Sequence, residues 1–154
     1  MKPRAAIILI EKDKIALIKR YRSRNQYLVF PGGKVKINET PVEAAAREAE
    51  EELGLKTTIG KMVAEVWYLG APQYYFLASS TGGEFGQGAG REMNNAPDSE
   101  KGSYLPIWVN VDSILDLPVL PRLMAEFVWK SFHEEWPESP LTVTDTLPEG
   151  SIDS

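Results

Sequence analysis

The sequence contains no cysteine and a single histidine among its 154 residues. Without cysteine the chain can form neither a disulfide bond nor a thiolate zinc site, and it has no cysteine nucleophile. This agrees with a reducing compartment, so we expect a cytoplasmic protein. The sequence also lacks an apolar run of the about 20 residues that a membrane-spanning helix requires. The apolar run at residues 5–10 is too short for a secretory signal.

Positive charge is in the minority, with 17 lysines and arginines against 22 aspartates and glutamates, which gives a net charge of -5. Such a chain has no general attraction for nucleic acid or anionic lipid, so we expect neither nucleic acid nor a membrane as a partner. With 43% apolar residues, the composition is that of an ordinary globular domain. We therefore expect one domain with a packed core.

Short runs rich in β-branched and aromatic residues predict several strands, arranged in a mixed sheet. They cover residues 5–10, 15–20, 27–30, 57–69, 74–79 and 108–111. Residues 80–104 are rich in Gly, Asn, Ser and Glu and predict a long loop that is either functional or disordered. Apolar residues at helical spacing predict a helix over 121–136, ended by Pro137. The polar residues 137–154 predict a flexible acidic tail, which limits the single domain to residues 1–136.

Residues 40–43 are typical of a helix start. Thr40 is a preferred N-cap residue, Pro41 suits the first helical position, and Glu43 completes a capping box. Gly54 is a typical C-terminal stop, so we expect a helix between these signals. One stripe of this helix can face the core, and it consists of Val42, Ala46, Ala49 and Leu53.

Three carboxylates, Glu48, Glu51 and Glu52, lie at positions i, i+3 and i+4 of the same helix and project within reach of one another. Their mutual repulsion, together with the electronegative end of the helix, makes this cluster unfavourable unless a cation neutralises it. Oxygen ligands without nearby His or Cys favour Mg²⁺, Mn²⁺ or Ca²⁺ over zinc, and of these we expect Mg²⁺, with Mn²⁺ as an alternative. Mg²⁺ also binds substrate phosphates and activates water for attack on phosphorus, so the cluster predicts phosphoryl chemistry.

The same segment resembles a known signature, the Nudix box G-x5-E-x7-R-E-U-x-E-E-x-G-U, in which U is a bulky aliphatic residue. The matching residues are Gly33, Glu39, Arg47, Glu48, Ala49, Glu51, Glu52, Gly54 and Leu55. Ala49 is a small residue for its position. An arbitrary run of glutamates would be read as a solvated helix face, and the fixed spacing favours the Nudix family instead.

The resemblance implies an α/β fold, a Nudix-like α/β/α sandwich with a central mixed β-sheet. It also implies Mg²⁺-dependent hydrolysis of a nucleoside diphosphate linked to another group. It makes Glu48, Glu51 and Glu52 metal ligands, with the Gly32 carbonyl as a further ligand. Glu39 and Arg47 then support the loop and orient the carboxylates.

A later carboxylate often joins such a site, and the candidates in this chain are Glu84, Glu92 and Glu100, of which we favour Glu100. The expected catalytic set is therefore Glu51, Glu52, Arg47 and Glu100.

Substrate contacts are expected from Arg22, Arg24, Tyr27 and Gly33, next to the box. A solvated arginine cluster and packing of Tyr27 in the core are the alternatives. Together these features predict a pyrophosphohydrolase acting on a small nucleotide-type substrate, either a nucleoside triphosphate or a diphosphate-linked compound. The alternative is a non-catalytic nucleotide-binding regulator on the same fold. The oligomeric state is left open, a homodimer included.

Overall fold

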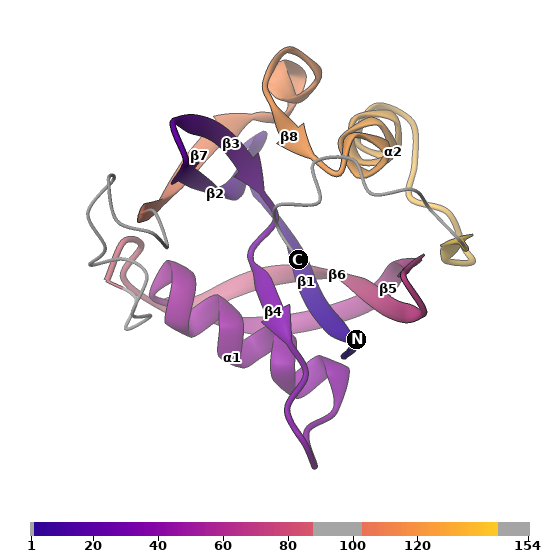
Figure 1. Cartoon of the computed structure of the whole chain (residues 1–154). Helices are drawn as coiled ribbons and strands as arrows, with labels where there is room; N and C mark the ends of the chain where they lie inside the picture. The colour runs from indigo at the N-terminus through magenta and orange to yellow at the C-terminus, as the bar shows by residue number, and fades with distance from the viewer. Residues whose placement is uncertain (1, 88–102, 145–154) are drawn as a thin grey trace.

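The computed structural model describes residues 2–87 and 103–144 of the chain (Figure 1). Its elements in chain order are β1 (Arg4–Glu11), β2 (Lys14–Arg22), β3 (Asn25–Val29), β4 (Gly32–Lys34), α1 (Pro41–Leu53), β5 (Leu55–Tyr68), β6 (Ala71–Gly83), β7 (Ser103–Asn110), the 3-10 helix η2 (Val111–Asp116), β8 (Val119–Leu120), α2 (Arg122–His133) and β9 (Leu141–Val143). None of the helices in these described stretches is long and apolar enough to cross a membrane.

The sheet is mixed, as the sequence predicted. Its strands follow the order β8-β3-β2-β1-β6-β5-β9, while β4 pairs with β1 and β7 pairs with β2. The pairs β1–β6, β3–β8 and β5–β9 are parallel, whereas β1–β2, β2–β3 and β5–β6 are antiparallel hairpins. The charged turn between β1 and β2 is tight because Lys12 and Asp13 both adopt positive φ angles, 52° and 64°.

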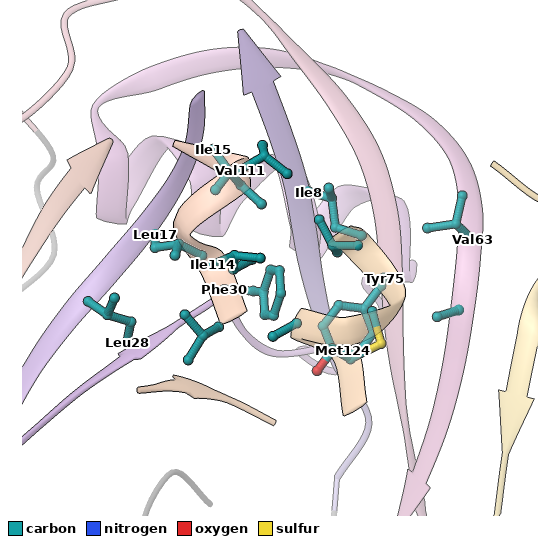
Figure 2. Close-up of a cluster of buried hydrophobic side chains, with 14 of the residues drawn as sticks. Ile8, Ile15, Leu17, Leu28, Phe30, Val63, Tyr75, Val111, Ile114 and Met124 are labelled. Carbon is teal, nitrogen blue, oxygen red and sulfur yellow. The ribbon is translucent and has the colours of Figure 1, made fainter. Parts of the chain in front are cut away.

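Alternating residues of β1 and β2 divide the core into two clusters, one on each face of the sheet. Ile7 and Leu9 pack in the cluster that includes α1, whereas Ile8 packs in the cluster that includes η2 and α2. Figure 2 shows part of the second cluster, in which Phe30 and Tyr75 lie with residues of η2 and α2. Because helices cover both faces, the α/β/α sandwich expected from the sequence is confirmed (Figure 1).

Several boundaries differ from those predicted. The loop expected after residue 30 contains the short strand β4, because Gly32 and Gly33 pair with Ala6 and Ala5 of β1. β6 continues to Gly83, and β7 begins at Ser103, so both strands extend into the predicted 80–104 loop. Helix α2 ends at His133, three residues earlier than predicted, before it reaches Pro137.

The predicted tail is wrong over part of its length. Residues 141–143 form β9, which pairs parallel to Ala64–Val66 of β5, and Leu141 and Val143 pack against the core. The Nζ of Lys61 donates a hydrogen bond of 3.0 Å to the carbonyl oxygen of Pro137. The sequence did not predict this strand, because its three residues are too few to show the alternation of apolar and polar residues typical of a strand. Residues 145–154 of the predicted tail lie outside the described part.

Candidate metal and active site

The ends of α1 form as the sequence predicted. The Thr40 N–H donates to Glu43 Oε1 at 2.8 Å, and the Glu43 N–H donates to Thr40 Oγ1 at 3.1 Å, which completes the capping box. Gly54 adopts φ 79° and its N–H donates to the Glu50 carbonyl at 3.0 Å. These caps are local, and they fix where the helix starts and stops along the chain.

The buried face of α1 is rotated relative to the predicted stripe. Ala44, Ala45, Ala49 and Leu53 are buried, whereas the predicted Val42 is 45% exposed and Ala46 is only half-buried. The helix packs against β1, β4 and β5, and the small alanines allow these strands to approach closely. With this rotation Glu52 is buried and Glu48 is half-buried, outside the stripe that was expected to face the core.

Glu52 is the buried acidic side chain on this helix, with only 7% of its surface exposed. Its Oε1 accepts a hydrogen bond of 2.8 Å from the backbone N–H of Gly32. Burial of a charged carboxylate is unfavourable without such a partner. The bond therefore links the last turns of α1 to the start of β4 and fixes the orientation of the carboxylate.

Glu48 lies against the neighbouring glycine. A Cβ atom placed on Gly33 would be 2.0 Å from Glu48 Oε2, so only glycine allows this approach. Burial raises the pKa of Glu48 above its usual value. The nearby Arg47 opposes this shift, Glu51 adds to it, and the positive charge of Arg4 opposes it as well. A nearby cation would stabilise the charged form of this half-buried carboxylate.

Arg47 connects the helix to the loop before it. Its Nε donates to Glu39 Oε2 at 2.8 Å, and its Nη1 donates to Glu48 Oε2 at 3.2 Å and to Glu51 Oε2 at 3.1 Å. Its Nη2 donates to the Lys34 carbonyl at 3.0 Å. The hydrogen bond from Arg47 outweighs burial and holds the pKa of Glu39 at about 2, while Glu39 raises the pKa of Arg47. Arg47 therefore links the loop before α1 to two of the carboxylates, and its positioning role stays a prediction.

A divalent cation agrees with the chemistry of these residues. Glu48 and Glu52 are held inward, while Glu51 keeps 41% of its side chain exposed. Arg47 bridges Glu48 and Glu51, so a guanidinium supplies positive charge between them in this structure. Within residues 2–87 and 103–144, no three acidic or histidine side chains converge at metal-binding distances. The donors are hard oxygens suited to Mg²⁺ or Mn²⁺, and their gathering requires side-chain movement on α1.

A cleft opens beside these carboxylates. It is lined by both glycines of β4, Arg4 and Ala6 of β1, and Gln73 and Tyr75 of β6, among others. Gly32 and Gly33 therefore border the cleft while they also contact Glu52 and Glu48. The sequence analysis missed Arg4 and Gln73, because only the pairing of β1 with β6 brings them together, and no local pattern signals that register.

The other predicted site residues are more scattered. Tyr27 is 4% exposed and packs in the α1-side cluster, which agrees with its alternative reading as a core residue. Arg24 lies exposed at the turn between β2 and β3, and Arg22 is half-buried near the end of β2. The backbone N–H of Glu84 donates to the Gly54 carbonyl at the end of α1. Glu92 and the favoured Glu100 lie outside the described residues.

Comparison with known proteins identifies a related family. A family model described as NUDIX domain matches residues 1–128. An 8-oxo-dGTP diphosphatase of Haemophilus influenzae is 47% identical over 53 residues, which are 33% of this chain and 39% of that protein. An 8-oxo-(d)GTP phosphatase of Mycolicibacterium smegmatis is 33% identical over 101 residues, which are 62% of this chain and 27% of that protein. The chain therefore matches less than half the length of either curated relative.

Solved structures share the fold. A NUDIX hydrolase from Nitrosomonas europaea has a TM-score of 0.72 and 20% identity, with 92% of this chain and 77% of that chain covered. An ADP-ribose pyrophosphatase from Streptococcus suis has a TM-score of 0.61 and 22% identity, with 94% and 98% covered. At these identities the likeness concerns architecture, and it agrees with the sandwich described above.

Proposed function

This chain belongs to the NUDIX domain family, and on that premise we propose that it is a metal-dependent hydrolase that cleaves the diphosphate linkage of a small nucleotide-type substrate. One observation carries the proposal. The two glycines of β4 contact Glu52 and Glu48 of α1 and border a cleft on the same short strand. A molecule held in the cleft would therefore place its phosphates beside Glu48 and Glu52.

Glu48, Glu51, Glu52 and the Gly32 carbonyl are the residues that would hold the metal, for which we propose Mg²⁺ or Mn²⁺. When bound, such an ion neutralises phosphate charge and lowers the pKa of water. The acidic chain, with its net charge of -5, needs this positive charge to attract a polyphosphate.

The protein residues supply orientation and proton acceptance. The Gly32 N–H donates to Oε1 of Glu52 and so orients this carboxylate. Arg47 donates hydrogen bonds to Glu48 and Glu51. Its bonds to Glu39 and the Lys34 carbonyl hold the guanidinium next to these two carboxylates. We assign proton acceptance from the attacking water to a carboxylate of the pair Glu51 and Glu52. We also propose Glu100 as the later carboxylate that joins this site, as metal ligand or base.

The substrate is a nucleoside triphosphate or a nucleoside diphosphate linked to another group. Hydrolysis would release a nucleoside monophosphate together with pyrophosphate or the remaining phosphorylated group. The curated relatives act, by their names, on 8-oxo-dGTP, which makes that compound a first substrate to test. We propose that the protein acts on free nucleotides in the cytoplasm.

The experiment is a hydrolysis screen of the full chain. The panel contains ordinary and 8-oxo nucleoside triphosphates, nucleotide sugars, ADP-ribose and dinucleoside polyphosphates, each with Mg²⁺, with Mn²⁺ and with excess chelator. We expect metal-dependent release of a nucleoside monophosphate from at least one compound. Tight binding of a nucleotide without turnover of any compound would contradict the proposal and favour a non-catalytic regulator.

A further inference from the structure

Three neighbouring strands build the floor of the cleft in two rows. In the first row, Arg4 of β1 lies opposite Gln73 of β6 on one side and Lys34 of β4 on the other. In the second row, Ala6 lies between Tyr75 and Gly32. Residues two apart on a strand share a face, so Arg4 and Ala6 both face the cleft, which they line.

The second row makes one end of the cleft apolar and hollow. Gly32 has no side chain, and a Cβ placed on it would clash with the backbone of Ala5 and lie 2.8 Å from the Cβ of Ala6, so β4 and β1 approach closely here and no side chain fills this end of the cleft. Tyr75 packs edge to face on Phe30, with ring centroids 5.6 Å apart, and both rings are buried (Figure 2). These two residues line the cleft and make this end apolar, which suits the apolar part of a heterocycle.

The first row makes the other end polar. Arg4 and Gln73 are both half-buried and lie on adjacent strands, so their side chains can reach one ligand edge together. Arg4 lines the cleft together with Gly32 and Gly33, the two glycines that contact Glu52 and Glu48. A nucleotide whose phosphates lie beside α1 would thus turn a base toward this row.

We infer that Arg4 and Gln73 are specificity-determining residues that select a guanine-type base over adenine. This inference rests on the proposed function for the presence of a nucleotide in the cleft. A guanidinium carries five N–H donors and no acceptor, and it pairs with the adjacent O6 and N7 acceptors of guanine. Adenine presents an amino group in place of O6, and this donor would face the donors of Arg4. The Gln73 amide can donate or accept, so it adapts to the remaining edge.

The test measures equilibrium binding of dGMP and dAMP by calorimetry, with the full chain and no added metal. The variants are Arg4→Met and Gln73→Met, which keep side-chain length and remove the polar groups. Lys56→Met, on the exposed side of β5, is the matched control. Thermal unfolding of each variant verifies that the fold is kept.

We expect wild-type protein to bind dGMP about tenfold or more tightly than dAMP. Arg4→Met should weaken dGMP binding by about 5- to 100-fold and change dAMP binding by less than about threefold, and Gln73→Met should act in the same direction with a smaller effect. Equal weakening of both nucleotides by Arg4→Met would show that Arg4 contacts the phosphate, and it would overturn the inference. Equal wild-type affinities, or no measurable binding of either nucleotide, would overturn it too.

Hydrolysis of dGTP and dATP by the same proteins separates this inference from the proposed function. Turnover of both compounds with equal kcat/KM, unchanged by Arg4→Met, would refute base selection and leave the hydrolase intact. Selective dGMP binding that depends on Arg4, without hydrolysis of any compound in the panel, would refute the hydrolase and retain the selectivity of the cleft.

Discussion

The backbone N–H of Gly32 donates a hydrogen bond of 2.8 Å to the Glu52 carboxylate, and this bond joins two residues that lie 20 positions apart. It crosses from the first residue of β4 to the last turns of α1. A backbone donor on a different element thereby orients a buried carboxylate. The site consequently depends on the spacing between strand and helix as well as on the glutamates.

Replacing Glu52 by glutamine should abolish most of the activity and preserve the fold. The amide oxygen of glutamine can still accept the Gly32 N–H, whereas the negative charge is lost. We expect kcat/KM to fall by about 10²- to 10⁴-fold. Glu50→Gln, a change at an exposed position of the same helix, is the control and should retain wild-type kinetics. Full metal-dependent activity in Glu52→Gln would mean that this residue has been assigned wrongly.

Replacing Gly33 by alanine should displace Glu48. The new methyl group would lie 2.0 Å from Glu48 Oε2, so the carboxylate must move away from β4. We expect a loss of about 10- to 100-fold in kcat/KM or metal affinity. Gly82→Ala, where a Cβ meets nothing within 4 Å, serves as the matched control. Steady-state kinetics and metal titrations measure both variants, and equal behaviour of the two would contradict the contact.

Replacing Arg47 by lysine should destabilise the protein although the charge is conserved. One ammonium group cannot bond Glu39, Glu48, Glu51 and the Lys34 carbonyl together, as the planar guanidinium does. We expect the free energy of unfolding to fall by about 1–3 kcal/mol in urea titrations. Arg24→Lys, at an exposed turn, should change it by less than about 0.5 kcal/mol. A similar small change for both would assign little stability to the network.

The pairing of Glu39 with Arg47 should make stability depend on acid pH. The pKa of Glu39 falls from 4.5 to about 2 on folding, so its contribution is complete above the unfolded value and disappears as the pH drops toward 2. In Glu39→Gln this contribution is absent at every pH. We therefore expect the difference in unfolding free energy between wild type and variant to be largest near about pH 6 and to vanish near about pH 2. A difference independent of pH would contradict this assignment.

The strand β9 should contribute to stability through its inward residues. Leu141 and Val143 pack against the core, whereas Thr142 between them is exposed. We expect Leu141→Ala to lower the free energy of unfolding by about 1 kcal/mol, in proportion to its partial burial. Thr142→Ala should have an effect below about 0.5 kcal/mol. Equal, negligible effects in thermal or urea unfolding would indicate that residues 141–143 are not held on β5.

Local signals predicted the helix and its caps well. Thr40, Glu43 and Gly54 act within one or two turns of the chain, so their roles follow from short-range hydrogen bonds. The spacing of Glu48, Glu51 and Glu52 likewise placed them on one helix. The inward face of α1 was less predictable, because packing against β1, β4 and β5 determines which residues are covered. Val42 is an apolar residue that the helix leaves exposed.

Long-range pairing was hidden from the sequence. Arg4 and Gln73 are neighbours on β1 and β6, although β2, β3, β4, α1 and β5 lie between these strands in the chain. No periodicity in the sequence indicates the register of this pairing. The role of Tyr27 was ambiguous for another reason. An aromatic residue in a strand is equally suited to a ligand site and to a core, and Tyr27 is buried in the core. Only packing distinguishes these readings. The same holds for β9, whose three residues carry no pattern of their own.

The strand β4 presents successive residues in opposite directions, Gly33 to the helix and Gly32 to the floor of the cleft. Gln73 lines the cleft from β6, on a different element from Glu48 and Glu52 of α1. Substitutions at residue 73 can therefore change the proposed base preference while these two carboxylates stay in place. The positive charge of Arg4 acts on Glu48, so replacement of Arg4 would alter both the base preference and the carboxylate site. Divergence of paralogues toward new nucleotides should consequently begin on β6 and reach position 4 last.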